Sequence, residues 1–106
     1  MAFSASLTLQ GTKAVIDLEG ELDSSTAPVF RSTIERAARV EIDTLVLEMS
    51  KLDYMSSAGL RGLVFASQKM AEGVEIVLVN PNQAVAQTIQ LVGLTHSVTI
   101  KDRVTE

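Results

Sequence analysis

The stretch LVLEMSKLDYMSSAGLRGLV, residues 45–64, decides the fold because it changes from one structural period to another. It opens with three consecutive apolar residues, a run typical of a central strand that is covered on both faces. From Ser57 the apolar positions recur at helical spacing, and polar residues lie on the other side. The stretch predicts a strand over 44–49, a loop over 52–59, and a helix from Ser57 that Gly73 ends.

The segment before this stretch begins with two alternating runs. Over residues 3–10 and 13–19, apolar and polar residues alternate, which is the period of a strand with one buried face. Gly11 and the next residue separate the two runs and provide a turn, so the first two strands are predicted to form a hairpin that ends near Gly20.

A helix is predicted to follow the hairpin and to start near residue 26. Apolar residues recur there at helical spacing: Phe30, Ile34, Ala37 and Ala38. Ser25 or Thr26 can cap this helix, and Pro28 falls in its first turn, where a missing N–H does little harm.

The remainder of the chain repeats the strand-then-helix order. VEIVLVN predicts a buried strand over 74–79, and Asn80 followed by Pro81 predicts a capped helix that Gly93 stops. SVTIKD, residues 97–102, predicts a short last strand.

The predicted order β-β-α-β-α-β-α-β is that of an α/β domain with a mixed, partly parallel sheet and helices packed on it. The length of 106 residues suits one domain spanning residues 1–106. Partners of such sheets tend to bind at the carboxyl ends of the parallel strands, which is where the predicted loop 52–59 lies.

Composition narrows the classes of function. The net charge of −4 opposes non-specific binding to nucleic acid or to anionic membranes, and no apolar run is long enough to span a bilayer. The N-terminus lacks the pattern of a secretory signal, so a cytoplasmic location is expected. The absence of cysteine excludes disulfides, thiolate metal sites and cysteine nucleophiles.

Signals for catalysis are weak. A serine nucleophile needs a base, and the one histidine, His96, lies near the predicted end of the last helix, where a surface role is more common. MSSAG differs from the G-x-S-x-G nucleophile elbow, the carboxylates are scattered, and no P-loop motif occurs. We therefore expect a protein that is not an enzyme and that holds no metal or cofactor.

Ser56 and Ser57 allow two interpretations. Serine before a helix accepts a hydrogen bond from a first-turn N–H and stabilises the helix by about 1 kcal/mol. The same helix end presents free N–H groups and a positive dipole, so a phosphate attached there can be held without unfolding the domain. In this second interpretation Gly59 lets the backbone come close to the phosphate.

Three segments together resemble the STAS domains of bacterial anti-sigma factor antagonists. They are GELDSSTAP at 20–28, the stretch 45–64, and VNPNQAVAQTIQLVGL at 79–94. The run S-S-A-G-L-R is the most specific part of the resemblance, which covers nearly the whole chain. It implies a four- or five-stranded mixed sheet covered by helices.

The resemblance also implies partner switching. An antagonist of this kind binds an anti-sigma factor, or a related ATP-dependent serine kinase, and thereby frees the sigma factor or another target. The kinase phosphorylates a serine at the start of the helix after the third strand, which ends the association. A metal-dependent serine phosphatase reverses the modification.

Matched residue by residue, the resemblance places the phosphorylated serine at Ser57, with Ser56 as the alternative. It places Asp23 in the partner-binding face, together with Ser56, Ser57, Gly59 and Arg61. A helix-capping role for Asp23 is an equally good interpretation. The alternative function is a STAS scaffold or small-molecule sensor within a larger signalling assembly, which needs the same fold but no phosphorylated serine.

Overall fold

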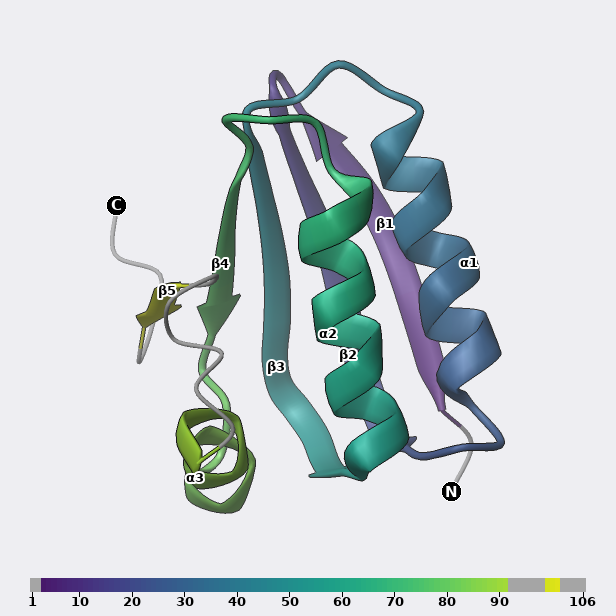
Figure 1. Ribbon diagram of the computed structural model, residues 1–106, viewed down its shortest axis with the longest axis vertical. Helices are drawn as coiled ribbons and strands as arrows, with labels where there is room; N and C mark the ends of the chain where they lie inside the picture. Colours follow the sequence, from purple (N-terminus) through teal and green to yellow (C-terminus); the bar gives the residue numbers. More distant parts are fainter. Residues whose placement is uncertain (1–2, 92–98, 102–106) are drawn as a thin grey trace.

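A computed structural model describes residues 3–91 and 99–101 of the chain (Figure 1). Its elements follow the predicted order: β1 (Ser4–Gln10), β2 (Lys13–Leu22), α1 (Ala27–Ala38), β3 (Thr44–Met55), α2 (Ser57–Lys69), β4 (Glu75–Val79), α3 (Gln83–Leu91) and β5 (Thr99–Lys101). The predicted α/β class is therefore confirmed.

The five strands form one mixed sheet in the order β1-β2-β3-β4-β5. β1 pairs antiparallel with β2 across the predicted turn, where Gly11 has a φ of 61°. The pairs β2–β3, β3–β4 and β4–β5 are parallel. β3 is the central strand, as its consecutive apolar residues predict.

The helices cover one face of the sheet. Their buried side chains join those of the strands in one cluster, which includes Phe30 and Ile34 of α1, Leu63 of α2 and Ile89 of α3. Figure 1 shows α1 and α2 side by side, with α2 in front of β2 and α1 beside β1. All three described helices pack into this one cluster. The expectation that β3 is covered on both faces is therefore wrong as far as described helices are concerned, because they cover only one of its faces.

The opposite, open face of the sheet carries a second, smaller apolar cluster. It consists of Val46, Val77 and Val79, with Val15 packed against them. These valines line a shallow hollow of about 350 Å³ whose rim carries Lys13, Asp17, Glu48 and Glu75 among other residues.

β3 is longer than predicted, and the predicted loop 52–59 is wrong. The strand continues to Met55, so Ser56 alone separates it from α2. Two shifts in the pairing register of β2 and β3 explain the difference. Asp17 pairs with Glu48 and Leu22 pairs with Met55, so five steps along β2 correspond to seven steps along β3, and the two extra residues of β3 form bulges. These bulges turn Leu52 and Met55 toward the core, which the simple alternation of a flat strand does not allow.

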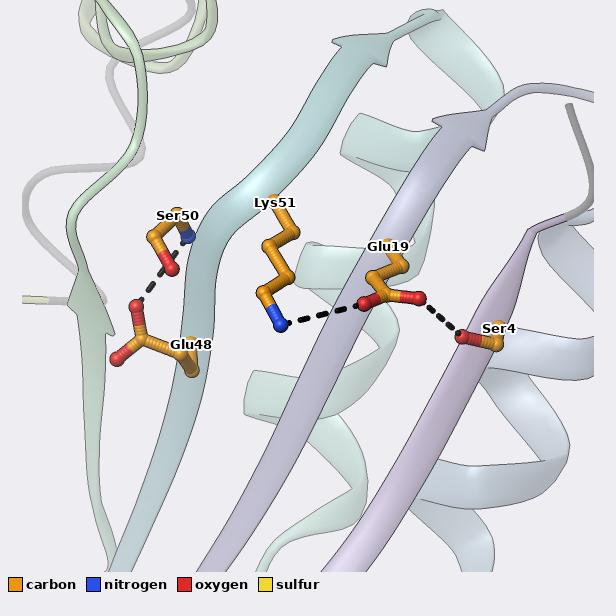
Figure 2. A network of polar contacts seen from close by, with 5 residues as sticks. All are labelled: Ser4, Glu19, Glu48, Ser50 and Lys51. Carbon is orange, nitrogen blue, oxygen red and sulfur yellow. Dashed lines mark hydrogen bonds and ion pairs between the residues drawn. The ribbon is translucent and has the colours of Figure 1, made fainter.

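Polar groups on the open face accommodate the first bulge. Ser50 has no partner in either strand register, and its N–H donates to Glu48 Oε2 over 3.2 Å (Figure 2). Lys51 Nζ lies 3.5 Å from Glu19 Oε2, and Ser4 Oγ donates to Glu19 Oε1 over 3.5 Å, so this contact links three strands. Lys51 and Glu19 are largely exposed, so the pair contributes little to stability.

Two helix boundaries also differ from the prediction. α2 ends at Lys69, four residues before Gly73. α3 starts at Gln83 rather than at Pro81, and its cap is Asn82, whose Oδ1 accepts from the Val85 N–H over 2.8 Å. Asn80 instead adopts a left-handed φ of 58°. The predicted end at Gly93 lies outside the described residues.

Candidate functional site

The candidate site is the junction at which β3 passes into α2. Only Ser56 lies between the two elements, and its N–H donates to the carbonyl of Leu22 over 2.9 Å. This bond holds the end of β2 against the start of α2. Asp23 follows Leu22 and Ser57 follows Ser56, so both candidates lie where β2 and β3 end, at the same end of the sheet (Figure 1).

Ser56 is the helix cap. Its backbone is extended, with φ −88° and ψ −179°, and its Oγ accepts a hydrogen bond from the Ala58 N–H over 3.2 Å. Its carbonyl accepts from the Leu60 N–H over 3.1 Å. Ser56 is half-buried, so the capping interpretation holds for this serine.

Ser57 occupies the first position of α2 and is exposed. Among the described residues its hydroxyl forms no hydrogen bond, in contrast to that of Ser56. A free, solvent-facing hydroxyl at a helix N-terminus is accessible to a modifying enzyme. A phosphate there lies at the positive end of the helix dipole.

Gly59 is buried at the start of α2. A Cβ at this position would lie 2.7 Å from Met55 Cγ and 2.9 Å from Leu22 Cγ. The missing side chain thus allows α2 to start close against the ends of β2 and β3. Position 59 therefore faces the core, and its lack of a side chain serves packing. The expected approach of its backbone to a phosphate stays a prediction.

Asp23 organises the loop between β2 and α1. Its Oδ1 accepts hydrogen bonds from Ser25 N over 3.0 Å, from Ser25 Oγ over 2.8 Å and from Thr26 N over 3.2 Å. The hydrogen bond from the Ser25 hydroxyl, followed by weaker contributions from the Thr26 and Ser25 backbone, lowers the pKa of Asp23 below its ordinary value. Thr26 is the N-cap residue, but its side chain makes no cap bond, so the carboxylate of Asp23 provides this cap.

Arg61 lies one helical turn after Ser57 on α2 and is exposed. Residues four apart on a helix have neighbouring side chains, so its guanidinium is within reach of a charged group on Ser57. The candidate site thus combines Asp23, Ser56, Ser57 and Arg61 at the surface. The buried Gly59 lets α2 start close to the ends of β2 and β3.

Sequence reasoning missed two residues beside the junction. Tyr54, two residues before the cap, leaves 51% of its surface exposed, which is unusual for a large side chain on a central strand. Asn82 donates through Nδ2 to the carbonyls of Leu52 and Asp53, over 3.2 and 3.3 Å, and so ties the start of α3 to the end of β3. A two-residue shift of the predicted cap, from Asn80 to Asn82, hid this contact.

Two further predictions bear on the site and its surroundings. His96 lies outside the described residues. Within residues 3–91 and 99–101, no helix is both long and apolar enough to cross a membrane.

The sequence matches the family model for the STAS domain over residues 5–106. The chain belongs to the STAS domain family. Among curated proteins it is similar to the anti-sigma-F factor antagonist RsfB of Mycobacterium tuberculosis, with 28% identity over 81 residues. That match covers 76% of this chain and spans 66% of the length of RsfB.

Solved STAS structures share the fold. An anti-sigma factor antagonist from Mycobacterium paratuberculosis superposes with a TM-score of 0.87 at 22% identity, covering 94% of this chain and 86% of that one. The phosphorylated form of SpoIIAA, a Bacillus cell fate determinant, superposes with a TM-score of 0.72 at 24% identity, covering 99% and 93%. The mixed sheet with its helices is thus the arrangement of these STAS domains.

Proposed function

We propose that this STAS domain is an anti-sigma factor antagonist that binds its partner when unmodified and is released by phosphorylation of Ser57. The observation that carries the proposal is the free, exposed hydroxyl of Ser57 at the first position of α2. The similarity to RsfB supports the class of partner.

The geometry favours Ser57 over Ser56 as the acceptor. The Ser56 hydroxyl already accepts the Ala58 N–H and is half-buried, so a phosphate on it would remove the helix cap. Ser57 has no such role, and a phosphate on it projects from the helix end into solvent. A modification that spares the cap leaves the fold intact.

The partners follow from what the domain lacks. The chain carries no P-loop motif of its own, so the kinase binds the ATP and transfers the phosphate to this domain. The resemblance implies that this kinase is the anti-sigma factor itself or a related serine kinase in the cytoplasm. A metal-dependent serine phosphatase restores the binding form. In this scheme the domain is the substrate of both enzymes and has no catalytic role.

The acceptor is tested with two single substitutions and the cognate kinase. Incubated with the kinase and ATP, Ser57→Ala should gain no phosphate, whereas Ser56→Ala should still gain one. Intact-protein and peptide mass spectrometry give the readout, and circular dichroism checks that both variants are folded. A phosphate on Ser56 of the parent protein would move the acceptor by one residue.

The second candidate, a scaffold or small-molecule sensor, is favoured by one observation. The hollow of about 350 Å³ on the open face lies on the side of the sheet away from the helices and is separate from the Ser57 junction. A protein that stays unmodified by its kinase, yet binds a small molecule at the cluster of Val46, Val77 and Val79, would support this candidate over the first.

A further inference from the structure

The two longest helices carry positive charge, although the chain as a whole is negative. From Ala27 to Arg39 and from Ser57 to Lys69, five basic residues accompany one acidic residue, Glu35. β2, β3 and β4 instead carry six acidic residues and two basic ones. The net charge of −4 therefore conceals a basic pair of helices on an acidic sheet.

Basic side chains line the groove between α1 and α2, which lie side by side (Figure 1). Arg31 of α1 lies over the ring of Phe65 in α2, with its Cζ 5.1 Å from the ring centre. Farther along the same two helices is a hollow of about 570 Å³, lined by Glu35, Ala38, Arg39, Gln68 and Lys69. Both walls of the groove thus contribute positive charge.

The groove leads away from Ser57. Arg61, Phe65 and Lys69 follow Ser57 at steps of four residues, so each lies about 40° farther around α2 than the one before. Arg61 and Lys69 therefore flank Phe65, whose ring meets Arg31. From Ser57 to Lys69 the helix rises about 18 Å, which about five or six residues of extended peptide would span.

The positive charge of the groove is not neutralised within the described part of the chain. The one ion pair among residues 3–91 and 99–101 joins Lys51 to Glu19, on the open face of the sheet. Arg31 contacts an aromatic face, and Glu35 is the single carboxylate among the residues that line the hollow. A groove of this kind attracts a negatively charged group.

Acidic residues beyond both ends of the groove limit what it can bind. Asp23 lies at the same end as Ser57, and the exposed Glu41 and Glu72 lie in the loops that follow α1 and α2. A long polyanion such as nucleic acid would extend past these carboxylates and be repelled. A short acidic peptide segment fits between them, so the charge pattern favours a protein partner.

We propose that the groove between α1 and α2 binds a short acidic segment of the partner that docks at Ser57. The identity of this partner rests on the proposed function, to which the groove adds the chemistry of the contact. A phosphate on Ser57 places a charge of about −1.5 to −2 at the start of the groove, one turn before Arg61. The phosphate repels the acidic segment, and this repulsion helps to release the partner.

The test measures the affinity of the purified partner for the parent chain and for charge-reversal variants, by calorimetry without ATP. Lys69→Glu reverses a charge more than three helical turns from Ser57, so it leaves the acceptor untouched. It should raise the dissociation constant about fivefold or more at low salt, and Arg39→Glu on the other wall should do the same. The difference from the parent should disappear near 1 M salt, where the Debye length is about 3 Å.

Lys51→Glu is the matched control. It makes the same charge change as Lys69→Glu at an exposed lysine on the opposite face of the sheet, and it should change the dissociation constant less than about twofold. Circular dichroism checks that each variant is folded. In a steady-state kinase assay, Lys69→Glu should raise KM for the domain and leave kcat unchanged, because it weakens docking and not phosphate transfer.

The outcomes separate the groove from the switch. If Ser57 of the parent is phosphorylated while Lys69→Glu and Arg39→Glu bind like the parent, the groove proposal is wrong and the proposed function stands. If Ser57 of the parent stays unmodified by the partner, the proposed function is wrong and the groove proposal falls with it. An equal loss in Lys51→Glu would trace the effect to net charge and overturn the groove proposal. A short DNA duplex that displaces the partner by binding in the groove would also overturn it.

Discussion

At the scale of single residues, the carboxylate of Asp23 connects the β2–α1 loop to the start of α1. One oxygen accepts bonds from Ser25 and Thr26, and the largest effect on its pKa comes from the Ser25 hydroxyl. Because the pKa of Asp23 is lowered in the folded state, its charged form stabilises the fold above the pKa of the unfolded chain. That stabilisation is lost as the pH falls through the folded-state pKa.

Ser25→Ala should therefore raise the pKa of Asp23 toward its ordinary value, because it removes the hydroxyl donor that lowers this pKa most. The measurement is an NMR titration of the Asp23 carboxyl carbon in both proteins. Ser24→Ala is the control, since Ser24 is exposed and has no hydrogen bond to Asp23 among those of the described residues. An unchanged Asp23 titration in Ser25→Ala would show that the backbone bonds alone set the pKa.

At the scale of elements, the packing of α2 on α1 depends on another glycine. A Cβ on Gly62 would lie 2.7 and 2.9 Å from Cδ2 and Cε2 of Phe30, a fully buried ring in α1. The two helices can approach this closely only because position 62 has no side chain. The same requirement operates at Gly59, one turn earlier on α2.

Gly62→Ala should destabilise the domain by about 1–3 kcal/mol, because the clash with Phe30 exceeds the gain of about 1 kcal/mol in helix propensity. Urea unfolding measures the change. Gln68→Ala, at an exposed position of the same helix, should alter the free energy of unfolding by less than about 0.5 kcal/mol. A neutral or stabilised Gly62→Ala would show that Phe30 moves aside without cost.

The order and type of these elements could be predicted from sequence because each carries a clear period. Leu45, Val46 and Leu47 indicate a central strand, and Phe30, Ile34 and Ala37 indicate one helix face. The bulges of β3 could not be predicted, since they depend on the register against β2, which local sequence does not encode. For the same reason the site was expected on a loop, whereas the structure places it at a one-residue junction.

The candidate site was recoverable only in part. Ser56 and Ser57 both fit a helix start, and only the hydrogen bond of Ser56 to Ala58 separates the cap from the free hydroxyl. Gly59 was noticed, but its contacts with Leu22 and Met55 are long-range and have no sequence signal. Tyr54 was missed because an exposed aromatic residue on a strand resembles a buried one in sequence.

At the scale of the whole molecule, the proposed switch adds charge to a protein that is already acidic. A phosphate on Ser57 contributes about −1.5 to −2, which the helix end and Arg61 can tolerate in solvent. Within an interface the same group must lose its water, and a buried ion without a matched partner costs several kcal/mol. Binding is therefore far more sensitive to the phosphate than folding is.

Phosphorylation of Ser57 should weaken binding to the kinase or anti-sigma partner by about a hundredfold or more. Ser57→Asp should weaken it less, since one carboxylate supplies less charge and bulk. Calorimetric titration of the modified and unmodified proteins gives the affinities, and circular dichroism should show the same fold in both. Equal affinities would reject the switch, and a lost fold would mean that the phosphate acts by unfolding.

The order of the strands in the sheet is also their order in the chain, because every strand after the first pairs with the strand that precedes it. During synthesis on the ribosome, each new strand therefore finds its hydrogen-bonding neighbour already made. No strand has to await a later segment, and each crossover closes a loop of modest length, for which the entropic cost grows only slowly. We expect the domain to assemble from its N-terminal hairpin onward while translation continues.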